Sequence, residues 1–321
     1  MNQLESLRAM TSVVADTGEF NKIAAFKPDD ATTNPSLILQ LVQLPQHSNL
    51  IPDAVIAAKS SSLNDSELID EVVDHLIVAV GCEIVKIVPG RVSIEVDARL
   101  SFSTSGSVSK ARKIISMFAN RGVDKSRIFI KLASTWECIR ACEVLEKEGI
   151  SCNMTLLFSF HQAIAAAQAN ASLISPFVGR ILDWHLKNAG GPYTSETDPG
   201  VLSVKRIYEH YKQHGYKTIV MAASFRNKDE ILGLAGCDKL TIAPKLLEEL
   251  SLCNEPVKRV LNQPECTEQE RPDDDLTEES FRWQMNQDAM ATEKLAEGIR
   301  NFHKDQEKLL ILIKSQLTYL F

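Results

Sequence analysis

Several motifs that would assign a function at once are missing from this sequence. It has no G-x-G-x-x-G after its first expected strand, no P-loop, no HExxH and no GxSxG, so nothing points to dinucleotide or nucleotide binding, a zinc peptidase or a serine hydrolase. No apolar run is long enough to span a bilayer, and residues 1–5 lack the basic-then-apolar pattern of a signal peptide. We therefore expect a soluble, cytoplasmic protein without a membrane partner.

Basic residues are also fewer than acidic residues. The 35 Lys and Arg residues against 42 Asp and Glu give a net charge of -7, which argues against nucleic acid as a partner. An anionic substrate would have to be held by local arginines. There is no CxxC pair among the seven cysteines, and several lie in apolar segments, so we expect buried, reduced thiols.

What the chain does contain is a repeated unit of amphipathic helix, glycine and short apolar strand. Its 321 residues, 44% hydrophobic and 24% charged, suffice for a sizeable core. Gly122, Gly149, Gly215 and Gly236 each fit the left-handed position that ends a helix, and each is followed by an apolar run. Such alternation predicts parallel β-α units.

Eight strands can be placed in this way. They are expected at residues 12–16, 31–33, 92–97, 128–133, 152–157, 173–175, 218–223 and 240–243. Eight parallel strands with intervening helices predict an α/β fold of the (β/α)8 TIM-barrel type, with a doubly wound open sheet as the alternative. We expect a single barrel domain over residues 1–321, an exposed connection near 254–277, and additional C-terminal helices in a segment at 278–321.

Lys131 is the most informative residue because it interrupts the apolar run at 128–133. A lone ammonium group is costly to bury in such a strand. The amine must either find an ionic partner or be partly neutral, and a neutral strand lysine near carboxylates is suited to Schiff-base chemistry.

Period-two alternation places further polar side chains at the carboxyl ends of neighbouring strands, the end at which barrel enzymes carry their active sites. These residues are Asp16, Glu95, Lys131, Asn153, Thr155 and Ser175. The competing interpretation is a buried ion-pair network that fills the barrel. Two carboxylates could divide the proton transfers, one at the imine and one at a substrate hydroxyl.

Other candidates are more ambiguous. Arg180 and Arg226 follow strand ends at comparable positions, where a pair of guanidinium groups suits phosphate, although either alone would be expected at a solvated surface. Asn34 before Pro35 fits a helix cap as well as a substrate contact. His210 and His214 have the i,i+4 spacing of a metal pair but no third ligand nearby, so we expect them on an exposed helix face.

Seven segments together resemble the transaldolases of the longer, enteric-bacterial and eukaryotic type. They are residues 13–18, 30–37, 95–99, 130–136, 152–159, 174–184 and 223–227, and the similarity extends from about residue 4 to about residue 309. The resemblance implies a (β/α)8 barrel, a homodimer and no metal or organic cofactor. It also implies Schiff-base transfer of dihydroxyacetone between sugar phosphates in the non-oxidative pentose phosphate pathway.

The resemblance also implies roles for individual residues. Lys131 would form the Schiff base, Asp16 would take the C4-hydroxyl proton, and Glu95 and Thr155 would position a catalytic water. The substrate-binding set would be Thr32, Asn34, Asn153, Ser175, Phe177, Arg180, Ser224 and Arg226, of which Arg180, Ser224 and Arg226 would hold phosphate.

Three positions depart from the family pattern: Ile94, Cys138 and Ala222 replace a common threonine and two glycines. We expect Ile94 to face the helices, Cys138 to alter helix packing, and Ala222 to narrow the barrel slightly. The nearest rival, fructose-6-phosphate aldolase, is shorter and usually has Gln and Tyr at the positions of Glu95 and Phe177. A sugar-phosphate-binding protein without catalysis is the other alternative.

Overall fold

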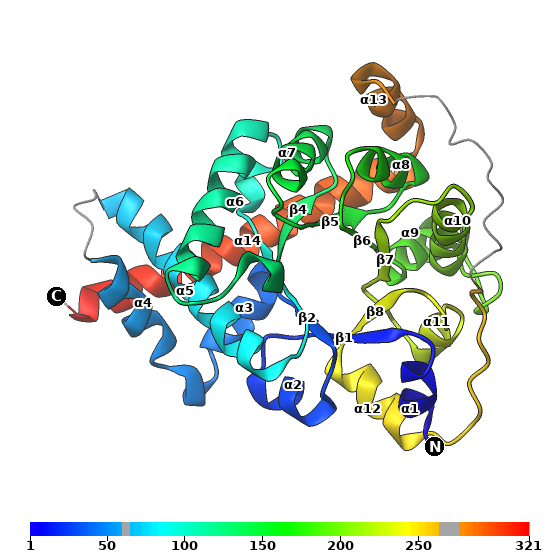
Figure 1. The fold of residues 1–321 in the computed structure, drawn as a ribbon, viewed down its shortest axis with the longest axis horizontal. Helices are drawn as coiled ribbons and strands as arrows, with labels where there is room; N and C mark the ends of the chain where they lie inside the picture. The colour runs from blue at the N-terminus through cyan, green and yellow to red at the C-terminus, as the bar shows by residue number, and fades with distance from the viewer. Residues whose placement is uncertain (60–64, 263–275, 321) are drawn as a thin grey trace.

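A closed barrel of eight parallel strands forms the centre of this computed structural model, which describes residues 1–59, 65–262 and 276–320 (Figure 1). The strands are β1 (Ser12–Asp16), β2 (Asp30–Thr32), β3 (Val92–Glu95), β4 (Ile128–Ala133), β5 (Cys152–Leu157), β6 (Leu173–Pro176), β7 (Ile219–Ala222) and β8 (Lys239–Ile242). Because β1 pairs with β8, the sheet closes, and the (β/α)8 prediction is confirmed over the open-sheet alternative.

The strand predictions hold with small shifts at the ends. β1, β4 and β5 have the expected bounds, and the other five strands differ by one or two residues at an end. Gly122, Gly149, Gly215 and Gly236 have φ values of 76°, 71°, 65° and 101°. This is the left-handed conformation that glycine adopts without a steric penalty, and at Gly122, Gly149 and Gly215 it ends the preceding helix. Gly236 lies in a turn beyond α11, whose C-cap is Gly233, so the prediction that Gly236 ends a helix is wrong.

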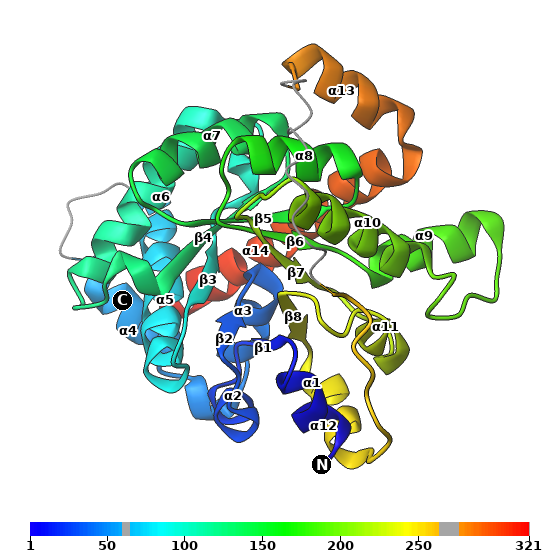
Figure 2. The same cartoon turned by 45° about the vertical axis from the view of Figure 1, so that its right-hand side comes forward.

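Helices wrap the outside of the barrel (Figure 2). They are α1 (Gln3–Arg8), α2 (Phe20–Phe26), α3 (Pro35–Val42), α4 (Leu50–Ala58), α5 (Asp65–Ile87), α6 (Thr104–Ala119), α7 (Trp136–Lys147), α8 (Phe160–Gln168), α9 (Gly179–Ala189), α10 (Pro199–Gln213), α11 (Lys228–Leu232), α12 (Pro244–Leu252), α13 (Glu278–Gln287) and α14 (Ala289–Leu320). The described part of the chain contains no helix with the length and apolar character needed to cross a membrane.

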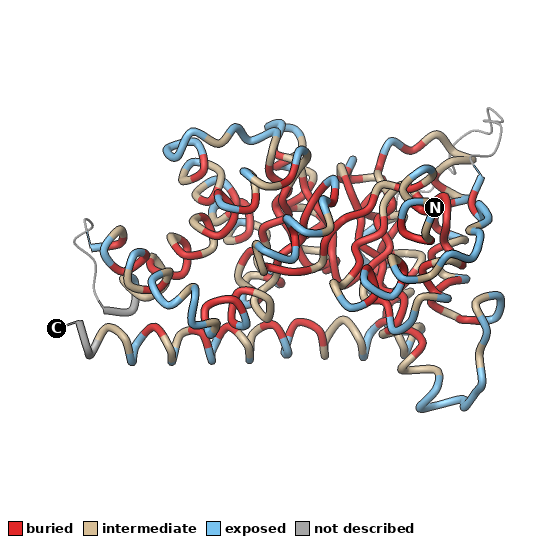
Figure 3. The backbone as a smooth tube through the Cα atoms, turned by 90° about the horizontal axis from the view of Figure 1, so that it is seen from below, coloured by how far each residue is buried: buried red, intermediate tan, exposed pale blue. Residues whose placement is uncertain are grey.

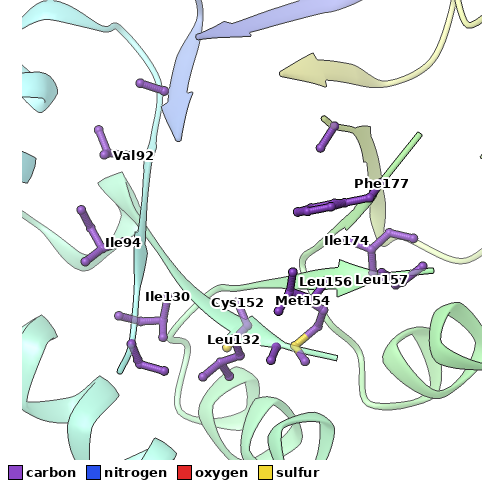
Figure 4. Packing of buried hydrophobic residues seen from close by; sticks show 14 of the residues in the cluster. Val92, Ile94, Ile130, Leu132, Cys152, Met154, Leu156, Leu157, Ile174 and Phe177 are labelled. Carbon is purple, nitrogen blue, oxygen red and sulfur yellow. The ribbon is translucent and has the colours of Figure 1, made fainter. Parts of the chain in front are cut away.

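Two apolar layers hold the barrel together. Outward-facing strand residues such as Ile94, Ile130 and Met154 pack against the helices (Figure 4). Inside, a separate cluster of Val14, Phe129, Leu173 and Met221 fills the barrel, each with 2% exposure or less. Asp16, Lys131 and Ser175 each follow a member of this cluster by two residues on the same strand, so these polar side chains lie one layer closer to the carboxyl ends.

The three departures from the family pattern all lie in the outer layer. Ile94 packs among the helices, as expected. Cys138 on α7 is buried, with its Sγ 3.5 Å from Ser107 Oγ on α6 and from the Ser101 carbonyl oxygen. Ala222 also belongs to the outer cluster, while its neighbour Met221 points inward. The expectation that Ala222 narrows the barrel is therefore wrong, because its methyl group points toward the helices.

The C-terminal part of the chain returns across the barrel. Helix α14 runs along one side of the molecule and ends far from the N-terminus (Figure 3). Its inner face packs on α3, on α5 and on β5. Residues 263–275 of the predicted exposed connection lie outside the described residues. His210 and His214 do not form an exposed face, since both are partly buried and the His210 ring lies 5.0 Å from the Phe160 ring.

A tight backbone contact at Gly200 yields a stability prediction. A Cβ atom at this position in α10 would lie 2.2 Å from the Val178 carbonyl oxygen, which belongs to rigid backbone at the start of α9. We expect Gly200→Ala to lower the free energy of unfolding by about 2 kcal/mol. Gly18→Ala is the control, because its nearest neighbour would lie at 3.4 Å. Equal urea midpoints for the two variants would contradict this account.

Candidate active site

The carboxyl ends of the strands open into one cavity, as the sequence predicts for a barrel enzyme. Nine of the twelve expected site residues line it: Asp16, Thr32, Asn34, Lys131, Thr155, Ser175, Phe177, Arg180 and Ser224. The other three, Glu95, Asn153 and Arg226, contact members of this set. The structure therefore brings together side chains from six strands, β1 to β6, and from the segments that follow β2, β6 and β7.

Lys131 has an ionic partner inside the barrel. β3 and β4 pair with Glu95 directly beside Lys131, and the Lys131 Nζ lies 3.2 Å from Glu95 Oε2. Both side chains are only 6% exposed. The amine also donates to the Thr33 carbonyl oxygen at 3.3 Å. A buried pair at this distance keeps the nitrogen fixed at the cavity wall, with a base within reach.

Two carboxyl groups near the amine are shifted in the same direction. Burial raises the pKa of Asp16, and the charge of Lys131, a hydrogen bond from Thr32 and the charge of Arg180 lower it by smaller amounts. Burial likewise raises the pKa of Glu95 against the opposing effect of Lys131. A carboxylate with a raised pKa is a stronger base, which suits it to proton transfer near neutral pH.

A chain of neutral polar groups crosses the interior from β6 through β5 to β3, the strand that carries Glu95. The Ser175 hydroxyl donates to Asn153 Oδ1 at 2.6 Å, and Asn153 Nδ2 donates to Ser93 Oγ at 3.0 Å. Asn153 is fully buried, so these bonds fix its orientation. The Thr155 Oγ1 is buried and has no hydrogen-bond partner among the described residues. It is free to hold a water molecule or a substrate hydroxyl.

Asp16 is oriented by two threonines. Thr32 Oγ1 donates to Asp16 Oδ1 at 3.1 Å and lies 2.9 Å from Thr241 Oγ1. Thr32 and Thr241 are 2% and 3% exposed, so the pair sits inside the barrel between β2 and β8. One oxygen of the Asp16 carboxylate is thereby held, and the group is aimed into the cavity.

Asn34 both caps a helix and lines the cavity, so the structure is compatible with the helix cap and the substrate contact that the sequence left open. It is the N-cap of α3, and its Oδ1 accepts a hydrogen bond from Leu37 N–H at 2.9 Å, with Pro35 in the first turn. It also lines the cavity. Capping fixes the carbonyl side of the amide, which leaves the Nδ2 group for other partners.

The two arginines stand at the start of α9 and on the loop after β7, and these two segments are joined through their backbones. Val178 N–H and Gly179 N–H donate to the carbonyl oxygens of Ala223 and Ser224, both at 2.9 Å. A Cβ atom at Gly179 would lie 2.5 Å from the Ser224 carbonyl oxygen, so glycine is required for this approach. Ser224 itself has a φ of 62°, a left-handed conformation that is strained for serine.

Arg180 and Arg226 differ in their environments. Arg226 is exposed and forms a forked pair with Asp183, in which its Nη2 lies 2.7 Å from Asp183 Oδ2 and its Nε lies 3.2 Å from Oδ1. Arg180 is partly buried and lines the cavity. Burial and the charge of Arg226 lower the pKa of Arg180.

A second cluster has the residue types of a metal site but a structural explanation. The ligand atoms of Cys142, Glu146 and Cys152 lie within 4.8 Å of one another. However, Glu146 Oε1 already accepts from Cys152 N–H at 2.8 Å and from Ser172 N–H at 2.6 Å, and Oε2 accepts from the Ser172 hydroxyl at 2.9 Å. The carboxylate therefore ties α7 to the starts of β5 and β6.

Four residues of the site were not predicted from the sequence. They are Thr241, which contacts Thr32; Asp183, which holds Arg226; Glu230, which accepts from Arg226 N–H at 2.6 Å; and Phe302 of α14, which lines the cavity. Thr241 could have been found by extending the period-two analysis to β8. The other three lie on helices, where spacing alone gives no indication of what they face.

The comparisons with known proteins agree with this geometry. The family model for transaldolase/fructose-6-phosphate aldolase matches residues 13–313. Proteins named transaldolase are 56% identical over 317 residues in Shewanella amazonensis and 55% identical over 318 residues in Alteromonas mediterranea, in each case covering 99% of both chains. A protein of that name from Methylobacillus flagellatus is 56% identical over 308 residues, which cover 96% of this chain and 97% of that protein.

The fold and the site thus define a (β/α)8-barrel protein with a buried lysine at the mouth of its barrel. The chain belongs to the transaldolase/fructose-6-phosphate aldolase family.

Glu230, which is 1% exposed beneath the Arg226 loop, makes stability depend on pH. Burial raises the pKa of Glu230 from 4.5 to about 7, with Asp198 adding to the rise and Arg226 opposing it. Between these two values the folded state keeps a proton that the unfolded state loses, so the free energy of unfolding falls as pH rises.

We expect Glu230→Gln, which keeps the acceptor for Arg226 N–H, to match the parent protein at pH 4.5 and to be more stable at pH 8. The gain should be on the order of 1–3 kcal/mol in urea denaturation. Glu209→Gln, at an exposed position on α10, serves as the control. An unchanged pH profile in Glu230→Gln would rule out Glu230 as the source.

Proposed function

We propose that this protein is a transaldolase. It would transfer a dihydroxyacetone unit from sedoheptulose 7-phosphate to glyceraldehyde 3-phosphate, giving erythrose 4-phosphate and fructose 6-phosphate in the non-oxidative pentose phosphate pathway. The observation that carries this proposal is the buried Lys131–Glu95 pair at 3.2 Å, beside a cavity that also contains Asp16 and Arg180. The names of relatives that are about 55% identical over nearly the whole chain support it.

The first stage is formation of an imine on Lys131. The neutral amine attacks the ketose carbonyl carbon at C2, and loss of water from the resulting carbinolamine gives an iminium ion. Glu95 is within 3.2 Å of the reacting nitrogen and can accept and return its protons. Thr155, whose hydroxyl has no partner among the described side chains, holds the water that moves in this step.

The second stage breaks the C3–C4 bond. Asp16 removes the C4-hydroxyl proton, the aldehyde leaves, and the electron pair of the broken bond enters the iminium to give an enamine on Lys131. The raised pKa of Asp16 strengthens it as this base. The enamine then attacks an acceptor aldehyde in the reverse sequence, and water releases the product from Lys131.

Substrate recognition is divided between the interior and the rim. The three-carbon unit is contacted by Thr32, Asn34, Asn153 and Ser175, and the cavity wall is completed by Phe177. At the rim, Arg180, Ser224 and Arg226 hold the phosphate group, because guanidinium groups bind phosphate oxygens through several N–H donors. The proposed chemistry uses side chains alone, without a metal or organic cofactor.

The family name also covers fructose-6-phosphate aldolase, so transfer must be distinguished from simple cleavage. Glu95 and Phe177 stand where the aldolases usually have Gln and Tyr, and the length of the chain also favours a transaldolase. We further propose that the protein is a cytoplasmic homodimer and that residues 1–321 form a single barrel domain.

Borohydride trapping tests the covalent step. In the presence of fructose 6-phosphate, reduction should fix a three-carbon adduct on Lys131 of the wild-type protein, detected by mass spectrometry of the labelled peptide. Lys131→Ala should keep the fold by circular dichroism and form no adduct, because the substitution leaves a small cavity and an unpaired Glu95. A trapped wild-type adduct at any other residue would overturn the assignment.

Asp16→Asn separates imine formation from bond cleavage. The amide cannot accept the C4-hydroxyl proton, so we expect kcat for transfer from fructose 6-phosphate to erythrose 4-phosphate to fall by about 10²- to 10⁴-fold. The variant should still be trapped on Lys131 by borohydride, now as the uncleaved sugar. A loss of trapping comparable to that in Lys131→Ala would contradict the division of roles.

Release of free dihydroxyacetone by the wild-type protein in place of sedoheptulose 7-phosphate would favour the aldolase alternative.

A further inference from the structure

Helix α14 closes the mouth of the barrel with residues from the last part of the chain. A Cβ atom at Gly298 would lie 2.6 Å from Leu156 Cδ2, so the helix approaches the end of β5 as closely as a glycine permits. Gln306 Nε2 donates to the Oδ2 atom of Asp97, which follows β3, at 2.7 Å. Ser36, at the start of α3, donates to Asp305 of α14. These contacts fix the rotation and height of α14 over the site.

Between these contacts, α14 presents one aromatic ring to the active-site cavity. Phe302 is 3% exposed and lines the cavity together with Lys131 and Arg180. The Arg180 Cζ lies 5.7 Å from the centroid of the Phe302 ring and 4.8 Å from that of the Phe177 ring. Arg180 therefore contacts two aromatic rings, one from the loop after β6 and one from α14.

The two rings occupy the place that a carboxylate takes beside Arg226. Asp183 neutralises Arg226 in a forked pair, whereas within residues 1–59, 65–262 and 276–320 no carboxylate oxygen lies within 4.0 Å of Arg180. An aromatic face attracts a guanidinium group without neutralising its charge. The ring also keeps water away from one side of the guanidinium group. The lower polarity strengthens the attraction between the guanidinium charge and an anion. Arg180 is thus held in place with its full charge available.

We propose that Phe302 is a specificity-determining residue that sets the preference of this site for phosphorylated over unphosphorylated sugars. The inference rests on the function proposed above and adds to it a residue from outside the strands and their loops. Phe302 acts on the phosphate end of the substrate by orienting Arg180, and it takes no part in proton transfer or imine formation at Lys131.

The test compares two acceptors that differ only in phosphate. Fructose 6-phosphate is the saturating donor, erythrose 4-phosphate or erythrose is the acceptor, and release of glyceraldehyde 3-phosphate is measured in both cases. Because the enamine forms before the acceptor binds, kcat/KM for the acceptor reports the second half-reaction alone. The ratio of the two kcat/KM values is therefore a direct measure of phosphate recognition.

In Phe302→Leu, which keeps an apolar side chain but removes the ring, we expect kcat/KM for erythrose 4-phosphate to fall about tenfold. The value for erythrose should change by less than about twofold, and borohydride trapping on Lys131 should persist. Phe302→Met, which is closer in volume, should give the same change in ratio and serves if the leucine variant does not fold. Ile313→Ala, at a buried position further along α14, controls for a loosened helix and should leave the ratio unchanged.

Parallel losses with both acceptors in the Phe302 variants, or an equal change of ratio in Ile313→Ala, would overturn the proposal. The wild-type protein distinguishes this failure from that of the broader function. If the wild-type protein forms no adduct on Lys131, the transferase itself is wrong, whereas a normal wild-type reaction with an unchanged ratio in Phe302→Leu removes only the role of Phe302.

Discussion

The chemistry of the site depends on the burial of one ion pair inside a parallel barrel. Lys131 and Glu95 are each 6% exposed, so both lose nearly all their hydration on folding, a cost of several kcal/mol for each ion that their attraction must offset. The attraction is strong enough only if the two charged groups are close together. The pairing of β3 with β4 places Glu95 directly beside Lys131. A shift by one residue would turn Lys131 toward the helices. Two apolar layers fix that register. They are the inner cluster that contains Phe129 and the outer layer of helices around the barrel.

Two of the four non-glycine residues with a positive φ in the described part of the chain, Leu156 and Ser224, lie at the same end of the barrel. Leu156 has a φ of 51° and follows Thr155 directly, at a point where the pairing of β5 with β6 shifts register. Ser224, with a φ of 62°, begins the loop that carries Arg226. Left-handed conformations cost a non-glycine residue roughly 1–2 kcal/mol, and they persist only where surrounding contacts determine them. The contact of Gly298 with Leu156 supplies one such constraint, so α14 stabilises the backbone next to Thr155 as well as covering the site.

The sequence was sufficient for the parts of this architecture that follow local rules. Glycines at helix ends and short apolar runs located the eight strands, and period-two alternation placed Lys131, Glu95 and Asn153 on inward faces. Positions at or after strand ends indicated Ser175 and the two arginines, and the motifs added Thr32. Residues that act from helices were not predictable, because the direction in which Asp183, Glu230 or Phe302 points depends on how α9, α11 and α14 dock. The direction of the Ala222 side chain was wrongly predicted for a related reason. Only the inward position of Met221 in the structure shows which residues of β7 face the barrel interior.

An acidic protein can bind anionic sugars when the arginines of the site are not neutralised by carboxylates of the protein itself. The net charge of -7 gives no general attraction for phosphate, so the selectivity must arise within a few ångströms of the site. Arg226 is exposed and already paired with Asp183, and an incoming phosphate must compete with that carboxylate. Arg180 is less hydrated and packs on aromatic rings, and an anion there meets a full charge in a less polar setting. Under the proposed function, this asymmetry would assign most of the attraction for phosphate to Arg180 and leave Arg226 as an adjustable second contact.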